Sequence, residues 1–192
     1  SDLVFLAKET SIRYPEHFVS DKREVSLQGD AFFDVAKNRE RPFWIDTEQV
    51  KIEVLGTAFS VKSVEDAPFR LSVQRGTVRL TLKKGNKECY VKAGETVVLK
   101  SQQLLLSANE NTEELNRYLK HVCFKDESLE HILKVMNMNA GSLQIRVASP
   151  ALEKRKLTVE FSNESPETVA TLIACALNLK CTRQGDIFML AE

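Results

Sequence analysis

The chain has 192 residues, 43% hydrophobic and 28% charged, which is enough for one large domain or two small ones with packed cores. Its 27 basic residues balance 27 acidic ones, and this zero net charge disfavours nucleic acid and anionic membranes as partners and favours proteins or small molecules. No apolar run reaches the roughly 18 residues of a membrane span and no signal peptide opens the sequence, so we expect a soluble piece of a longer protein.

The first half of the chain alternates β-branched or aromatic residues with polar ones at period two, which is typical of half-buried strands. The pattern is densest over residues 24–61. Strands are predicted at residues 25–27, 31–35, 43–45, 50–61, 69–73, 77–82, 89–91, 96–99 and 103–106. The sequence therefore predicts an all-β domain over residues 1–106.

Isolated glycines recur just after apolar positions, at Gly29, Gly56, Gly76 and Gly94. Their spacing is irregular, so they mark a loose repeat. Short strands of this kind bury their apolar faces only against neighbouring strands. Both a sandwich and a solenoid-like arrangement satisfy this pattern.

Polar residues at 107–111 interrupt the strand pattern, and apolar positions at helical spacing follow them. Acidic residues precede these positions, as they do in the first turn of many helices. We assign residues 107–119 to a linker with a short helix, and residues 120–192 to a second domain.

The second domain contains a repeat, in which residues 124–132 align with residues 161–169. In each copy a strand end is followed by a serine suited to cap a helix, Ser128 or Ser165, and Pro166 fits the first helical position of the second copy. Amphipathic helices are predicted after both serines, and strands at 143–147, 180–183 and 187–190. The sequence predicts two β-α-β repeats with a final strand, and an α+β fold class for the whole chain.

Catalytic and metal sites are disfavoured by the spacing of the reactive residues. His121 and Cys123 lie two residues apart on a predicted strand, but no third residue completes a catalytic set. Glu127 and His131 are four residues apart where a helix begins, without a second histidine to hold a metal. No glycine-rich loop follows a strand to hold phosphates. We predict a protein that is not an enzyme and uses neither a cofactor nor a metal.

The four cysteines, Cys89, Cys123, Cys175 and Cys181, show no C-x-x-C spacing. They allow two disulfides with three possible connectivities, or free thiols. Each neighbourhood is apolar, and we expect buried free thiols.

Five runs of the first half form a recognisable pattern: residues 12–15, 22–37, 41–43, 54–61 (VLGTAFSV) and 76–78. In these runs the chain resembles the periplasmic domain of FecR-type anti-sigma factors. The repeated module over residues 120–192 is similar to the C-terminal domain of Bacteroidetes members, which has the layout of the short N-terminal module of secretins and TonB-dependent proteins.

The resemblance implies the periplasmic part of a transmembrane anti-sigma factor, anchored to the inner membrane in the full-length protein. Its implied partner is the N-terminal signalling domain of a TonB-dependent outer-membrane transducer. An extracytoplasmic-function sigma factor would be held by a cytoplasmic segment outside this chain, and signalling would release it, commonly through regulated proteolysis.

A signalling role of this kind needs a protein surface, and small α+β modules often offer an unpaired strand edge. The final strand, Ile187, Phe188, Met189 and Leu190, is our predicted partner-binding segment. The alternative is a core strand covered by the two helices.

A second function remains open on the sequence alone. Trp44 and the ten phenylalanines could supply a stacking surface, which would make the chain a periplasmic carbohydrate- or ligand-binding protein.

Overall fold

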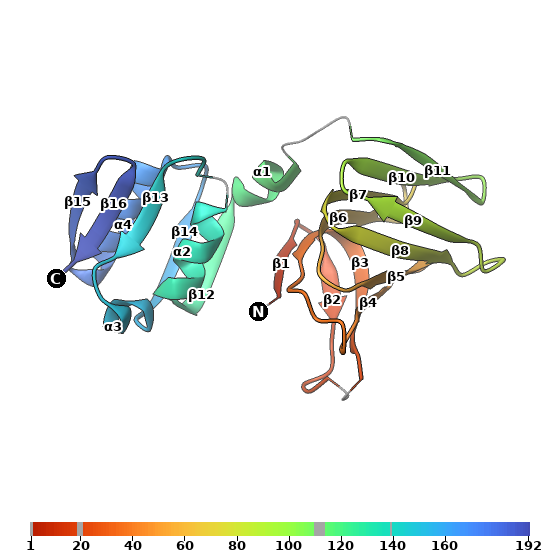
Figure 1. The fold of residues 1–192 in the computed structure, drawn as a ribbon, viewed down its shortest axis with the longest axis horizontal. Coiled ribbons are helices and arrows are strands. Elements are labelled where there is room, and N and C mark those ends of the chain that lie inside the picture. The colour runs from red at the N-terminus through yellow and green to blue at the C-terminus, as the bar shows by residue number, and fades with distance from the viewer. Residues whose placement is uncertain (1, 19–20, 110–113, 139) are drawn as a thin grey trace. The chain divides into compact units, whose positions relative to one another are not determined.

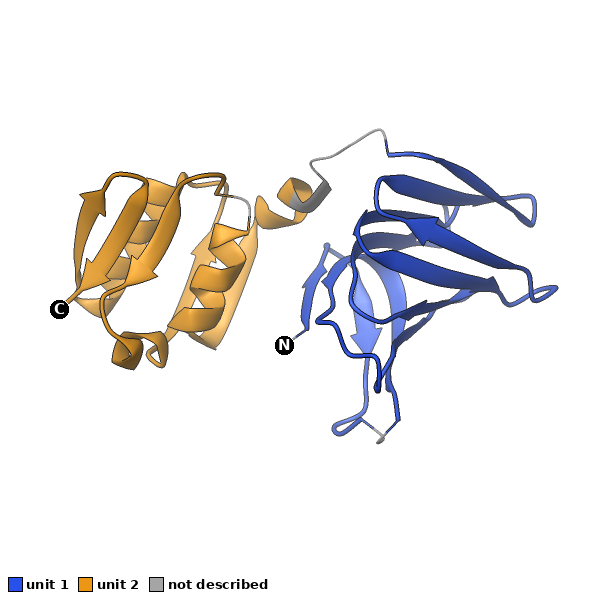
Figure 2. Ribbon diagram, in the orientation of Figure 1, with its two compact units in different colours: residues 1–114 blue, residues 115–192 orange. Residues whose placement is uncertain are grey.

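The computed structural model describes residues 2–18, 21–109, 114–138 and 140–192. The chain divides into two units, residues 1–114 and 115–192 (Figure 2). It is mostly β, with 49% of its residues in strands and 16% in helices. The predicted linker at 107–119 includes residues 110–113, which lie outside the described residues. None of the helices in the described part of the chain is long and apolar enough to span a bilayer.

Eleven strands form one continuous sheet in unit 1 (Figure 1). They are β1 (Leu3–Leu6), β2 (Ser11–Arg13), β3 (Arg23–Asp34), β4 (Phe43–Asp46), β5 (Val50–Val54), β6 (Ala58–Ser63), β7 (Arg70–Arg75), β8 (Thr77–Leu82), β9 (Glu88–Lys92), β10 (Glu95–Lys100) and β11 (Gln103–Ala108). Their order is β11-β10-β7-β6-β3-β4-β5-β8-β9, with β1 and β2 also paired to β3. The sheet curls toward a barrel, and β9 comes close to β7 and β10.

The curled sheet encloses an apolar core that receives side chains from nearly every strand. Phe33 and Phe59 stack inside it with ring centroids 5.3 Å apart, and both are fully buried. Burying an aromatic ring of this size stabilises a fold by about 2–3 kcal/mol. The structure thus replaces the sandwich and solenoid alternatives with one sheet curled around a single core.

The strand β3 joins the two halves of this sheet. Its first half pairs with β2 and β4, and its second half with β1 and β6. The sequence prediction of two strands with a break at Gly29 is wrong, because β3 continues through this glycine with φ +124°. The predicted strand over residues 50–61 is instead divided into β5 and β6 around Gly56.

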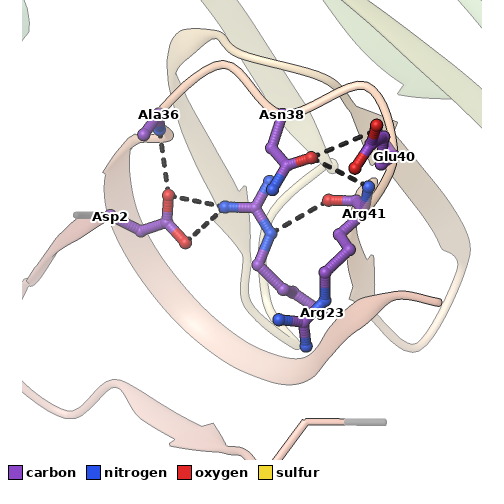
Figure 3. A network of polar contacts seen from close by, with 6 residues as sticks. All are labelled: Asp2, Arg23, Ala36, Asn38, Glu40 and Arg41. Atoms are coloured by element: carbon purple, nitrogen blue, oxygen red, sulfur yellow. Dashed lines mark hydrogen bonds and ion pairs between the residues drawn. The ribbon is translucent and has the colours of Figure 1, made fainter. Parts of the chain in front are cut away.

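An ion pair at the start of the chain holds β1 to the centre of the sheet (Figure 3). The Asp2 carboxylate accepts hydrogen bonds from Arg23 Nη1 at 2.7 and 2.6 Å and from the Ala36 backbone N–H at 2.9 Å. Arg23 Nε donates to the Arg41 carbonyl at 3.0 Å, and the guanidinium lies 5.5 Å from the Phe43 ring centroid. Arg23 is only 8% exposed, so this pairing compensates a buried charge.

Unit 2 consists of two small sheets and four helices. Its elements are α1 (Glu114–Leu119), β12 (Val122–Ser128), α2 (Leu129–Asn137), β13 (Gln144–Val147), α3 (Pro150–Glu153), β14 (Lys156–Phe161), α4 (Pro166–Leu177), β15 (Lys180–Gln184) and β16 (Ile187–Ala191). The pair β12-β14 forms one sheet and β13-β16-β15 the other. The helices α2 and α4 each contact strands of both sheets (Figure 1).

Both predicted helix starts are confirmed. The Ser128 hydroxyl accepts from the His131 N–H at 3.3 Å, and the Ser165 hydroxyl accepts from the Thr168 N–H at 3.2 Å. Pro166 occupies the first turn of α4, where its missing N–H costs nothing. The helix α3 was not predicted, and it lies in the connection from β13 to β14 that joins the two repeats.

Replacing Gly29 by alanine should destabilise unit 1 strongly. A Cβ there would lie 2.5 Å from Thr10 Oγ1 and 2.7 Å from Thr10 Cα, and the backbone φ disfavours any side chain. We expect Gly29→Ala to lower the free energy of unfolding by at least about 3 kcal/mol. Urea unfolding followed by the fluorescence of Trp44, the single tryptophan, measures this directly.

Gly85→Ala is the matched control, because Gly85 also has a positive φ but no atom within 4 Å of the added Cβ. We expect a loss of about 1 kcal/mol there. Equal losses in the two variants would show that the contact with Thr10 does not constrain β3.

Candidate partner-binding surface

The predicted partner-binding strand, β16, lies in the middle of its sheet. Residues Ile187–Leu190 pair in parallel with β13, and Ile187–Ala191 pair antiparallel with β15. The expectation of an unpaired edge at Ile187–Leu190 is therefore wrong, since both sides of β16 are hydrogen-bonded and cannot accept another strand. Partner binding by these residues stays a prediction, and it has to use side chains.

Successive side chains of a strand point to opposite faces of the sheet, so the four predicted residues are divided between two faces. Phe188 and Leu190 are buried and face the helices, whereas Ile187 and Met189 are half-buried on the opposite, outer face. Ala191, also half-buried, continues the outer column. Only Ile187 and Met189 of the predicted segment are therefore in a position to contact a partner.

The strand register places polar residues on both sides of this apolar column. Gln144 and Gln184 flank Ile187, Arg146 and Thr182 flank Met189, and Lys180 is paired with Ala191. We call this set of eight residues the outer face of the three-stranded sheet. An apolar centre with a polar rim is the usual composition of a protein-binding surface.

Sequence reasoning missed the rim because it depends on strand order. Residues 187–191 alternate between two apolar sets, so the pattern alone could not say which set faces outward. Arg146 and Lys180 are 34 positions apart in the chain, and only the pairing of β13 and β15 with β16 brings them to one face.

The reactive residues singled out in the sequence form no catalytic set. His121 precedes β12, and its Nδ1 lies 3.3 Å from the Ser162 hydroxyl. Cys123 is exposed on β12, with Glu160 opposite it. Among the described residues, no three His, Cys, Asp or Glu side chains gather in a way that could hold a metal ion.

Glu127 and His131 instead belong to the start of α2. Glu127 Oε1 accepts from the Ser128 N–H at 2.9 Å and lies 3.1 Å from His131 Nδ1. The Ser128 hydrogen bond, aided by the charge of His131, holds the pKa of the Glu127 carboxyl below its usual value. This is the structural role of a helix-start carboxylate.

All four cysteines are free thiols, but none is buried. Cys123 and Cys175 are exposed, and Cys89 and Cys181 are half-buried, where burial raises the pKa of both thiols. The expectation of core positions is wrong because Cys123 alternates with the buried Val122 and Phe124, which places it on the solvent side of β12.

Unit 1 has an open cavity of about 480 Å³. Its described lining is polar except for Leu27, includes Arg13, Asp46 and Lys83, and contains no aromatic side chain. An adjoining depression of about 300 Å³ adds Tyr14, which is 67% exposed. Trp44 lines neither hollow. Of the aromatic surface that the sugar-binding alternative requires, only the Tyr14 ring lies at these two hollows.

Comparison with known proteins gives a family match for the first part of the chain and a fold for the whole of it. A family model described as FecR protein matches residues 2–79. Two crystal structures of a putative anti-sigma factor from Parabacteroides distasonis ATCC 8503, at 1.65 and 2.50 Å, are 22% identical to this chain with a TM-score of 0.57. The similarity covers 100% of this chain and 90% of that chain, so both units share its fold. No curated protein matches the sequence.

The helix-start carboxylate makes the stability of unit 2 dependent on pH. Because the Glu127 pKa is lower in the folded state, the carboxylate stabilises the fold above its unfolded pKa of about 4, and this contribution disappears as the pH falls through the folded value. We expect Glu127→Gln to cost about 0.5 kcal/mol near pH 7, a small loss because the side chain is 36% exposed.

Thermal unfolding followed by the helical circular dichroism signal measures this effect, since the helices lie at or beyond Glu114. The difference between the variant and the wild type should vanish below about pH 3. A difference that stays constant between neutral and acidic pH would assign the effect to packing of the side chain.

Proposed function

We propose that this chain, whose residues 2–79 match the family model described as FecR protein, is the periplasmic receiving part of a transmembrane anti-sigma factor. It binds the N-terminal signalling domain of a TonB-dependent transducer. The signal passes to an extracytoplasmic-function sigma factor held by a cytoplasmic segment outside residues 1–192, and regulated proteolysis releases that factor.

The observation that carries this proposal is the pairing of a FecR-type unit with a second unit in one chain. The putative anti-sigma factor of P. distasonis has the same fold over the full length of this chain. A protein that merely bound a small ligand through unit 1 would have no need of unit 2. The presence of both units therefore supports a relay, in which one unit meets the partner and the other passes on the change.

The chemistry of unit 2 suits a receiver. Its candidate surface is a flat sheet face with an apolar centre, and no catalytic set or metal cluster lies among the described residues. Binding to such a face transmits a signal through a difference in free energy between two states of the receiver. The similarity to a FecR protein and to a putative anti-sigma factor supports a regulatory role rather than an enzymatic one.

The direct test is isothermal titration of residues 1–192 with the purified signalling domain of the transducer encoded beside this gene. We expect saturable one-to-one binding in the micromolar range, because a small sheet face buries a standard or smaller interface area. The signalling domain of a transducer from an unrelated locus is the control and should bind at least about tenfold more weakly.

Two results would contradict the proposal. One is the absence of heat and of complex formation with every neighbouring transducer. The other is equal affinity for neighbouring and unrelated signalling domains. Titration of the same protein with oligosaccharides tests the remaining alternative, in which the cavity near Tyr14 and Arg13 binds a carbohydrate.

A further inference from the structure

The three-stranded sheet of unit 2 differs from the rest of the unit in its charge. Its strands β13, β15 and β16 carry three basic residues, Arg146, Lys180 and Arg183, and no acidic residue. The two-stranded sheet has both signs, and its Lys156 and Asp126 form an ion pair at 2.8 Å. The three-stranded sheet therefore carries only positive charges, whereas the two-stranded sheet carries both signs.

Two of the three basic residues belong to the outer face. Arg146 is paired with Met189 and Lys180 with Ala191, so both point to the side of the apolar column, and both are exposed. Neither forms an ion pair with another described residue. Arg183 is paired with Phe188 and faces the other way, with its guanidinium 5.4 Å from the Phe188 ring centroid.

The register gives the spacing of the two cations. Arg146 and Lys180 lie two strands apart, and their partners on β16 are two residues apart. With strands about 4.8 Å apart and about 3.4 Å per residue, their Cα atoms are separated diagonally by roughly 12 Å. Ile187, Met189 and Ala191 fill the centre between and beside them.

We propose that this outer face is the surface that receives the transducer's signalling domain, and that it selects a partner surface with carboxylates on either side of an apolar patch. The proposal rests on the function proposed above. Charge complementarity decides the occupant, since an exposed cation pair with no counter-charge of its own favours an acidic protein surface and disfavours a basic one. The apolar column supplies contact area, and the two cations set orientation and association rate.

The test compares two charge-reversal variants of residues 1–192 against the neighbouring transducer's signalling domain. Arg146→Glu/Lys180→Glu reverses the outer face. Lys125→Glu/Lys134→Glu is the matched control, with the same change in formal charge at two exposed residues on β12 and α2. At about 50 mM salt we expect the first variant to bind at least about tenfold more weakly and the control to stay within about twofold of wild type.

Salt provides a second readout that a folding defect would not reproduce. Raising the salt to about 500 mM should weaken wild-type binding and narrow the gap between the wild type and the Arg146→Glu/Lys180→Glu variant, because screening removes the interaction that the variant lacks. The neutral variant Arg146→Gln/Lys180→Gln should fall between the two. If charge reversal lowers the thermal unfolding temperature, this neutral variant still measures the effect of the two charges on binding.

The possible outcomes distinguish failure of this inference from failure of the proposed function on which it rests. If the wild type binds the signalling domain and both outer-face variants bind as tightly, the proposed function stands and the outer face is not the docking surface. Equal losses in the outer-face and control variants would likewise overturn the inference, since they would reflect total charge. If the wild type binds no neighbouring signalling domain, both proposals fail.

Discussion

The shared strand β3 is the constraint on which the structure of unit 1 depends. One strand serves both halves of the sheet because its backbone passes through Gly29 in a conformation that a side chain would block, with Thr10 packed where a Cβ would stand. Beyond this point Ala31, Phe33 and Val35 enter the core in alternation. The continuity of the curled sheet through β3 depends on that one close approach of Thr10 to Gly29.

Local signals in the sequence predicted local structure well. Ser128 and Ser165 cap their helices because a serine hydroxyl placed before an amphipathic run has a nearby N–H to accept from, whatever the rest of the fold does. Strand positions were predictable for the same reason. The order of the strands was not, because β3 pairs with β6 and β4 across long stretches of chain that leave no trace in the period-two pattern.

The candidate surface shows the same division. Residues 187–191 were predicted as a strand, but both of their alternating sets are apolar, so the sequence could not tell the helix-facing Phe188 from the outward Met189. The expected unpaired edge was also wrong, because β16 lies between β13 and β15. What the structure adds is the neighbours of β16, and with them a charged rim that was invisible when Arg146 and Lys180 were read separately.

The central claim is that unit 2 receives a protein partner on the outer face of its three-stranded sheet. The chain has three methionines, and only Met189 lies on that face, whereas Met136 is in α2 and Met138 ends it. Methyl NMR of methionine-labelled protein therefore tests the claim with three signals, one for each methionine. The spectra are compared with and without the transducer's signalling domain. The account predicts that the Met189 methyl signal shifts or broadens while the other two stay in place. A shift at Met136 or Met138 with Met189 unchanged would contradict it.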